Sequence, residues 1–486
     1  MATTTTTAFS SSSSFAFFAT ALAFSLLLSL NTANGGALQQ QQQQHFYTVQ
    51  LSSLFPSDSC SPAPSTKGLN KLPVFHKHGP CAQAQQLTST ANQPKPTADE
   101  ILRQDESRVQ NIQSRKATAG SADVRVTDST TIPAKDSSTV GSGNYVVTVG
   151  LGTPAKKLSL ILDTGSDVTW TQCQPCVKFC HQQKEKIFFD PSSSKTYRNV
   201  SCEAAVCSAL AEATGNRDCS SSTCVYVIKY GGAAITTGFF ATEKLTLTKT
   251  DVFDEFYFGC GQNIQVNFGG AAGVLGLGRN SLSLVSQTSD KYKNLFSYCL
   301  PSTPSGTGFL TFGGAGAKSV KYTPIASVAG GENFYGIGIT AISVGGKKLP
   351  VSASVFSAAG AIIDSGTAIT RLPPAAYSAL RSAFRKKMSK YPLGPALSIL
   401  DTCYDLSKFK NFVVPKIGFF FAGGAEVDIE AVGILYANKP TQVCLAFAAN
   451  GNATDVAILG SVQQQTLEVV YDGAGGRVGF ASGGCK

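Results

Sequence analysis

Charged residues are scarce in this chain: they make up 14% of its 486 residues, and none occurs before Asp58. Histidine is rarer still, with 4 in the whole chain. Serine and cysteine hydrolases need a histidine as their general base. From residue 140 onward the only histidine is His181, which lies inside a cluster of cysteines, so the sequence argues against both of these enzyme classes.

Dense blocks of lysine and arginine are also missing. The formal net charge of +10 is spread along the chain rather than gathered into a stripe, so we expect no nucleic-acid partner. Long apolar runs are missing after residue 30, and the final residues FASGGCK do not form an anchor tail. We therefore expect no stable membrane anchor, and we expect a monomer.

The N-terminus contains the one long apolar run, FAFFATALAFSLLLSL (Phe15–Leu30), which small residues follow at Ala33–Ala37. This pattern predicts a secretory signal peptide over residues 1–33, although its usual basic start is missing. The Ser/Thr-rich opening MATTTTTAFSSSSS is instead typical of plastid transit peptides, and the apolar run could also be a signal anchor. We expect secretion to the extracellular space or apoplast, with the chloroplast or the vacuole as alternatives.

Cysteine is plentiful, and the 14 cysteines of the chain predict disulfide bonds in an exported protein, with a pairing that the sequence leaves open. Cys60 and Cys81 precede the strand-rich region. The candidates within that region are Cys173, Cys176, Cys180, Cys202, Cys207, Cys219, Cys224, Cys260, Cys299, Cys403, Cys444 and Cys485. The run CQPCVKFCH also has the spacing of zinc ligands, but export favours disulfides, and we expect no metal and no cofactor. Asn199 and Asn452 are N-glycosylation acceptors if the chain is exported.

The region before residue 132 is rich in Gln, Ser, Thr and Pro and contains one predicted helix, TADEILRQDESRVQNIQSRK (Thr97–Lys116). Thr97 can cap this helix, with Glu100 three residues later completing a capping box. From Gly143 onward the chain changes character. Short runs of β-branched and aromatic residues separated by glycine-rich turns predict strands.

Two segments of this strand-rich region repeat one pattern, in which an apolar strand ends in Asp, then Ser or Thr, then Gly. They are LILDTGSDVTWT (Leu160–Thr171) and AIIDSGTAITRL (Ala361–Leu372). Each is followed later by apolar residues closed by a glycine, VLGLG in the first half and ILGS in the second. The alignment sets Asp163 against Asp364. A single Asp-Thr-Gly is weak evidence, whereas the duplicated order is specific.

Paired carboxylates explain why an acid would end a buried strand. Two neighbouring carboxylates cannot both ionise cheaply, so the pair holds one proton over a range of pH. One carboxylate can then take a proton from a water while the other donates to a substrate carbonyl. Backbone amides freed by the glycines, and hydroxyls beside or across the pair, would support it. The expected supporting residues are Thr164, Gly165, Ser166, Ser365, Gly366 and Thr367.

The motifs DTGSDVTW and DSGTAITRLP, with the two later glycine elements, resemble pepsin-type aspartic endopeptidases. The cysteine-rich insert Cys173–Cys224 and the phrases FGCGQ and GVLGLGR resemble the plant nepenthesin-like branch. FHKHGPC (Phe75–Cys81) and the helix after it are similar to relatives of a chloroplast-nucleoid aspartic protease. The resemblance covers about residues 70–486 and implies an all-β, bilobal, pepsin-like fold. Two β-barrel-like lobes would flank a central substrate cleft, with a few short helices.

The resemblance also implies how the chain is divided and what it does. Residues 34–132 would form an inhibitory prosegment, 140–320 the N-terminal lobe with its cysteine-rich insert, and 321–486 the C-terminal lobe. Asp163 and Asp364 would activate a water and hydrolyse polypeptide substrates at acidic pH, in an enzyme made as a zymogen.

Basic residues of the predicted helix would act in that prosegment. Arg103, Arg108, Arg115 and Lys116 could pair with cleft carboxylates at neutral pH and release them as the acids protonate. The alternative is that these residues simply form a solvated face of the helix.

A β-hairpin flap carrying a tyrosine is a further implication of the resemblance, and Tyr230 with Gly231 matches its start. Trp170, seven residues after Asp163, matches the tryptophan that hydrogen-bonds the flap tyrosine, although it could be plain core. The tip is Tyr-Gly-Gly-Ala-Ala where the family usually has Tyr-Gly-Asp-Gly-Ser. We expect weaker clamping of substrate or an altered specificity.

Two other functions compete with proteolysis. One is a catalytically silent binding or inhibitor protein of the same fold, against which both intact Asp motifs argue. The other is DNA binding in a plastid, which the positive charge suits but which lacks a basic cluster.

Overall fold

The computed structural model describes Met1 and residues 45–485, except 56, 58, 62–70, 85–95, 119–143, 181–187, 231–234, 266–269, 315–316, 318 and 330. The chain divides into two units, Met1–Tyr47 and Thr48–Lys486. Apart from Met1, the predicted signal peptide lies outside the described residues. No helix in the described ranges is long and apolar enough to cross a membrane.

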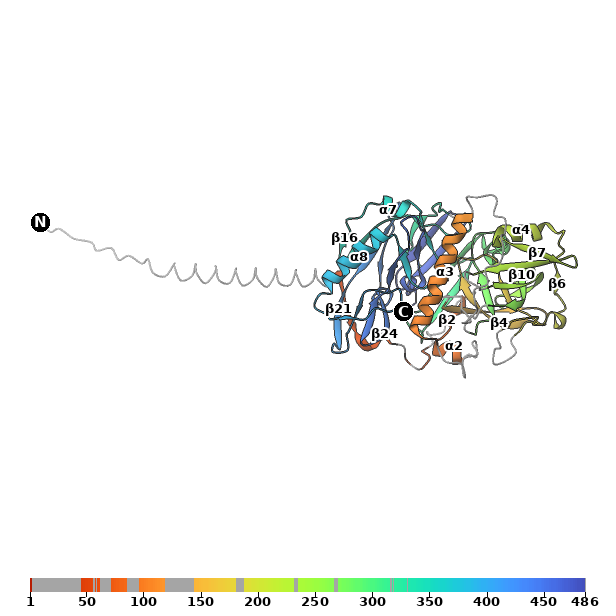
Figure 1. Ribbon diagram of the computed structural model, residues 1–486, viewed down its shortest axis with the longest axis horizontal. Helices are drawn as coiled ribbons and strands as arrows, with labels where there is room; N and C mark the ends of the chain where they lie inside the picture. The colour runs from red at the N-terminus through yellow and green to blue at the C-terminus, as the bar shows by residue number, and fades with distance from the viewer. Residues whose placement is uncertain are drawn as a thin grey trace, which may run out of the picture. The chain divides into compact units, whose positions relative to one another are not determined.

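Strands dominate the second unit, and most of its helices are short (Figure 1). The helices are α2 (Pro80–Ala84), α3 (Ala98–Thr118), α4 (Ala205–Thr214), α5 (Leu284–Gln287), α6 (Ser289–Tyr292), α7 (Ser354–Ser357), α8 (Pro374–Lys387), α9 (Ala431–Ile434) and α10 (Ser461–Gln464), with 3-10 turns η1 (Leu51–Leu54), η2 (Pro191–Ser193) and η3 (Ala422–Gly424). The predicted all-β class is therefore confirmed.

One large sheet runs through the unit in the order β14-β29-β28-β12-β13-β2-β3-β4-β11-β5-β10-β9-β8-β7, with β6 paired to β9. Its first strands are β2 (Lys71–His76), β3 (Tyr145–Leu151), β4 (Lys156–Asp163), β5 (Trp170–Gln172), β6 (Arg198–Asn199), β7 (Arg217–Ser220), β8 (Thr223–Lys229) and β9 (Ile235–Thr246). The others are β10 (Val252–Ile264), β11 (Gly273–Gly276), β12 (Leu295–Cys299), β13 (Thr307–Phe312), β14 (Lys321–Pro324), β28 (Glu468–Asp472) and β29 (Arg477–Ala481). Strand β2, from the region before the repeats, lies between β3 and β13.

Three smaller sheets build the second half of the chain, each of four strands. They are β17 (Ala361–Ile363), β27 (Ala457–Leu459), β18 (Thr370–Leu372) and β26 (Phe447–Ala449); β16 (Lys347–Lys348), β15 (Ile339–Val344), β22 (Ile417–Phe421) and β23 (Glu426–Ile429); and β19 (Leu393–Gly394), β20 (Cys403–Tyr404), β25 (Gln442–Leu445) and β24 (Leu435–Lys439). The remaining strands are β1 (Phe46–Gln50) and β21 (Asn411–Pro415). The large sheet takes strands from both halves of the chain, so its strand pairing does not separate one lobe from the other. The predicted domain boundaries therefore stay predictions.

The repeat found in the sequence is a repeat of strand pairing. In the first half β4 lies parallel to β11, so that Asp163 stands opposite Gly276 of the VLGLG element. In the second half β17 lies parallel to β27, and Ile363, just before Asp364, stands opposite Leu459 of the ILGS element. Each aspartate therefore ends a buried strand beside the glycine element of its own half.

Seven disulfides pair all the cysteines. They join Cys60 to Cys81, Cys173 to Cys260, Cys176 to Cys180, Cys202 to Cys219, Cys207 to Cys224, Cys299 to Cys485, and Cys403 to Cys444. The cysteines with zinc-ligand spacing are thus oxidised and offer no thiolate to a metal.

Helix α3 confirms the helix predicted from Thr97 onward, and its capping box is present. The Thr97 hydroxyl accepts from the Glu100 amide at 3.2 Å, and the Glu100 carboxylate accepts from the Thr97 amide at 2.6 Å. Figure 1 shows α3, in orange, crossing between the green strands of the first half and the blue strands of the second. Three of its apolar side chains are buried: Leu102, Val109 and Ile112.

Candidate active site

Asp163 and Asp364 are both buried, with 1% and 0% of their surface exposed. Asp163 is the last residue of β4, and Asp364 follows the last residue of β17 directly. Both strands end at these positions, and the chain turns at the residues that follow each aspartate. The two ends of strand meet, so the structure brings together the two acids that the sequence repeat aligned.

The first carboxylate is held by its own turn. The amide of Gly165 donates to Asp163 Oδ1 at 3.1 Å, and the hydroxyl of Ser166 donates to Asp163 Oδ2 at 2.5 Å. Hydrogen bonds to a carboxylate favour its charged form and fix its orientation.

The second carboxylate receives the same set of bonds. The amide of Gly366 donates to Asp364 Oδ1 at 2.9 Å, and the hydroxyl of Thr367 donates to Asp364 Oδ2 at 2.5 Å. In both halves Oδ2 therefore accepts from a hydroxyl of its own turn, whereas Oδ1 lies against the glycine of the other turn.

The two turns are also bonded to each other. The Thr164 amide donates to Ser365 Oγ at 3.0 Å, and the Ser365 amide donates to Thr164 Oγ1 at 3.0 Å. Ser365 Oγ in turn donates to the carbonyl of Leu162 at 3.0 Å. These reciprocal hydrogen bonds fix the distance between the two turns, and therefore between the two carboxylates, without involving a carboxylate oxygen.

Glycine is required in each turn because the turn touches the opposite carboxylate. A Cβ atom on Gly165 would lie 2.6 Å from Asp364 Oδ1, far inside van der Waals contact. A Cβ atom on Gly366 would collide in the same way with Asp163 Oδ1. Any side chain here would push the two acids apart.

Arg108 of helix α3 bridges the pair. Its Nη2 atom lies 2.6 Å from Asp163 Oδ1 and 3.0 Å from Asp364 Oδ1. Its Nε atom donates to Asp364 Oδ2 at 2.9 Å, and its Nη1 atom lies 3.3 Å from Asp163 Oδ2. One guanidinium thus makes a charge-assisted contact with every oxygen of both carboxylates.

These contacts shift the ionisation of the groups involved. Burial raises the pKa of Asp364, but the charge of Arg108 and hydrogen bonds from Arg108, Thr367 and Gly366 outweigh it and hold that pKa below its usual range. Burial lowers the pKa of Arg108, but the charges of Asp163 and Asp364 more than reverse this and raise it. With α3 in place, Asp364 is therefore held in its charged form.

Of the four basic residues predicted to pair with cleft acids, Arg108 alone is placed at the pair by the described contacts. The prediction is wrong for Arg103, which pairs with Asp99 one turn earlier on the same helix at 3.2 Å, with 64% of its side chain exposed. The side chains of Arg115 and Lys116 lie outside the described residues. The other possibility, a solvated helix face, thus describes Arg103.

A second contact of α3 was missed by sequence reasoning. The buried carboxylate of Asp105 accepts from the amides of Ala368 at 2.6 Å and Ile369 at 3.2 Å, and it pairs with Arg371 at 3.0 Å. An acid three residues before Arg108 lies one helical turn away, so helix spacing alone could have suggested that both face the same surface.

Gln464 was also missed. Its amide nitrogen donates to the backbone carbonyls of Leu459 at 2.8 Å and Asp364 at 3.3 Å, and its oxygen accepts from Tyr298. This buried glutamine holds the backbone that carries Asp364. The run of glutamines that begins two residues after the ILGS element was the available sign.

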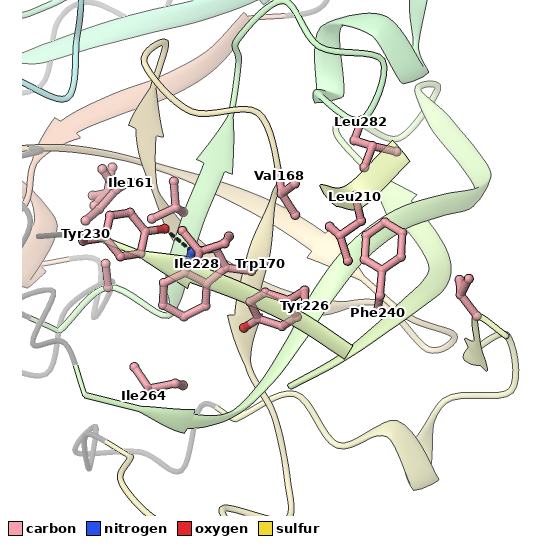
Figure 2. Packing of buried hydrophobic residues seen from close by; sticks show 14 of the residues in the cluster. Ile161, Val168, Trp170, Leu210, Tyr226, Ile228, Tyr230, Phe240, Ile264 and Leu282 are labelled. Carbon is pink, nitrogen blue, oxygen red and sulfur yellow. Dashed lines mark hydrogen bonds between the residues drawn. The ribbon is translucent and has the colours of Figure 1, made fainter. Parts of the chain in front are cut away.

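Tyr230 and Trp170 form the contact that the resemblance implied. Trp170 Nε1 donates to the Tyr230 hydroxyl at 2.6 Å, and Figure 2 shows the two side chains meeting inside an apolar cluster. Trp170 is fully buried in that cluster, so its core role and its hydrogen bond coexist. Gly231 and the rest of the flap tip, residues 231–234, lie outside the described residues.

Two family models together match most of the strand-rich region. The family model described as "Xylanase inhibitor N-terminal" matches residues 145–314, and the one described as "Xylanase inhibitor C-terminal" matches residues 334–482. Each matched segment contains one of the two acids.

Curated relatives match most of the chain. An aspartyl protease family protein of Arabidopsis thaliana is 57% identical over 90% of this chain and 93% of its own length. Aspartyl protease AED1 of the same plant is 51% identical over 90% of this chain and 92% of its own length. Aspartic proteinase nepenthesin-1 of Nepenthes gracilis is 35% identical over 71% of this chain and 79% of its own length.

Solved structures share the fold at low sequence identity. The structure of edgp aligns with a TM-score of 0.55 at 21% identity, over 72% of this chain and 93% of that one. Basic 7S globulin from soybean aligns with a TM-score of 0.56 at 20% identity, over 70% and 94%. The predicted bilobal, pepsin-like fold is confirmed.

Proposed function

This chain belongs to the plant branch of the pepsin-type aspartic protease family, and from that membership we propose that it is a secreted endopeptidase made as an inactive precursor. Its class, an aspartic-type endopeptidase that acts on peptides, follows from the relatives. The catalytic pair, the mechanism, the inhibitory segment and the destination are parts of the proposal.

One observation carries the catalytic assignment: a single nitrogen of Arg108 lies within 3.0 Å of an inner oxygen of both Asp163 and Asp364. A water in that position would touch both carboxylates. In the free enzyme the two acids, locked at this separation, share one proton. One carboxylate takes a proton from the water as it attacks the peptide carbonyl, and the other donates to the carbonyl oxygen.

The same observation supports a zymogen. While Arg108 sits between the carboxylates, a water and a substrate carbonyl have no room there, so the precursor is inactive. The docked helix keeps Asp364 ionised, whereas the free pair would bind a proton. Because the undocked state binds more protons, falling pH favours release of α3.

The disulfides and the glycosylation acceptors of the chain support secretion. Seven disulfides suit an oxidising compartment. Asn199 and Asn452 are both exposed, as acceptors of glycosylation must be. The chloroplast and the vacuole are the other destinations to test, and a monomer is the expected state.

A catalytically silent binding protein of the same fold is not favoured. Asp163 and Asp364 are both present, and each accepts the same set of hydrogen bonds from its own turn. Relatives at 51% and 57% identity are named as proteases.

Acidification of the purified precursor tests the proposal. We expect a new N-terminus, found by sequencing, and peptide cleavage that pepstatin blocks. Precursor held at neutral pH is the control. A chain that is properly folded, loses its segment and still cleaves no peptide would make it a binding protein instead.

A further inference from the structure

Asp105 places a carboxylate where nothing in the catalytic pair requires one. Its side chain is fully buried, and it accepts hydrogen bonds from the backbone amides of Ala368 and Ile369. These amides belong to the turn that carries Asp364. Two amides aimed at one carboxylate form a small anion site on the second half of the chain.

Arg371 completes this site with a positive charge. It is 1% exposed, and its Nη2 atom contacts Asp105 at 3.0 Å and Glu106 at 3.2 Å. Its Nη1 atom donates to the carbonyl of Ile369 at 3.0 Å, which fixes the guanidinium in place. Among the described residues its Nε atom has no hydrogen-bond partner.

Both acids that contact Arg371 come from α3, so the ion pair lasts only as long as the helix stays docked. The surroundings are otherwise apolar: Ala368 and Ile369 pack in a buried cluster with Leu102 and Leu400, and Tyr436 lies against its edge. Burial, with a smaller effect from the charge of Asp105, raises the pKa of the Tyr436 hydroxyl to about 12. When α3 leaves, Arg371 loses both of the carboxylates that now contact it, so another anion is favoured in their place.

The site lies close to the reacting atoms. Asp105 precedes Arg108 by one helical turn, about 5 Å along the axis. An extended peptide advances about 3.3 Å per residue. A substrate lying along the surface that α3 now covers would therefore bring a side chain to Arg371 one or two residues from the bond that is cut.

We propose that Ala368, Ile369 and Arg371 form a specificity subsite that binds the carboxylate of an aspartate or glutamate side chain of the substrate, and that Asp105 occupies it in the precursor. This inference rests on the proposed function, because it requires that α3 be removed from the active enzyme. The subsite would also disfavour lysine or arginine at the same substrate position, since each would meet Arg371 charge to charge.

Peptide pairs that differ only by Glu or Gln test the subsite. The Glu is moved through the three positions on each side of the cleaved bond, and kcat/KM is measured with the acid-matured enzyme at pH 5, where a peptide glutamate is mostly ionised. At one position we expect Glu to be preferred over Gln by about 10- to 100-fold, the range of a charge-assisted hydrogen bond. A Lys peptide should fall below the Gln peptide there.

Matched precursors then assign the preference to Arg371. Arg371→Gln alone would leave Asp105 buried without its cation, so it is combined with Asp105→Asn, which restores a neutral pair. The Asp105→Asn precursor is the control, because shedding its segment leaves the wild-type enzyme. We expect the control to keep the Glu:Gln ratio and the double variant to lose it. The ratio is taken within each enzyme, so differences in overall turnover do not enter.

The outcomes separate the two proposals. Cleavage of Gln peptides by the wild-type enzyme, with no position that prefers Glu, overturns the subsite and leaves the protease intact. A preference that survives in the double variant overturns the role of Arg371. Absence of all cleavage defeats the proposed function itself. If the double variant fails to fold, the wild-type peptide series still decides whether an acid is recognised.

Discussion

The carboxyl group of Asp364 is kept ionised by its neighbours against the cost of its complete burial. Thr367, Gly366 and Arg108 all bond to it, and the first two remain when α3 leaves. Such a fixed set of donors lets one carboxylate accept a proton at a defined place, which acid–base catalysis requires.

Replacing Asp364 with asparagine should abolish this exchange while keeping the shape of the site. We expect kcat of the matured enzyme to fall by about 10²- to 10⁴-fold, the range for loss of a general acid or base. The control is Asp254→Asn, a change at an exposed acid that pairs with Lys244 at the surface. Turnover of Asp364→Asn equal to that of the control would rule out the assigned pair.

Replacing Arg108 tests how the precursor is kept inactive. Arg108→Met removes the bridging charge but keeps much of the side-chain volume, so the carboxylates can share a proton while α3 is still docked. We expect half-conversion to occur about one pH unit higher than in the wild type, measured by gel after incubation across pH. Arg103→Met, on the exposed face of the same helix, should convert like the wild type. A shift shared by both variants would show that any loss of helix charge suffices.

At this scale the sequence predicted the acids and their supporting hydroxyls because a duplicated motif places them. It did not distinguish Arg108 from Arg103, since both are basic residues on one helix. Only the rotation of α3 against both halves decides which of them reaches the pair. Arg371 was hidden in the same way, because its partner Asp105 lies 266 residues earlier in the chain.

Helix α3 is also held by polar side chains whose partners its sequence pattern could not predict. Gln113 bonds both to the amide and to the carbonyl of Val456, at 2.9 Å each, and Asn111 donates to the carbonyl of Lys229 at 3.3 Å. The helix therefore contacts both halves of the chain. Its existence followed from the capping box, whereas its partners depend on tertiary structure.

Leu102 tests how firmly this element is docked. It is fully buried among apolar side chains of the second half, so Leu102→Ala should weaken docking by about 2 kcal/mol or more. Hydrogen exchange of α3 in the neutral precursor should then speed up by about 30-fold or more. Gln110→Ala, at an exposed position of α3, is the control. Equal protection in both variants would mean that the polar contacts of α3 hold the helix without help from Leu102.

The position of strand β2 in the large sheet could not be predicted from the sequence. It belongs to the predicted prosegment, yet it pairs with β3 and with β13 inside the large sheet. Its alternating burial is typical of an ordinary strand, and nothing local marks it as an insertion between strands from later in the chain. Disulfide pairing was equally undecided, because Cys299 and Cys485 meet across 186 residues.

The whole catalytic unit is organised by its internal repeat. Each half supplies one acid at the end of a strand beside a glycine element, and Thr164 and Ser365 join the halves. The bilobal fold could be predicted because the repeated motifs resemble those of pepsin-type proteases, whose fold has two lobes. The way in which one helix closes the site against both halves could not, because no local pattern encodes it.

We expect acid to release helix α3 from both halves of the catalytic unit. The lowered pKa of Asp364 belongs to the docked state, so docking is strongest at neutral pH and is lost as pH falls toward that lowered pKa. Hydrogen exchange pulsed within seconds of a pH jump should show α3 opening before any cleavage occurs. Helix α8, which lies apart from α3 in the second half (Figure 1), is the internal control for the effect of pH on exchange itself. If α3 and α8 keep the same relative protection from pH 7 to pH 3, or if cleavage precedes opening, proton uptake at the carboxylate pair does not drive release.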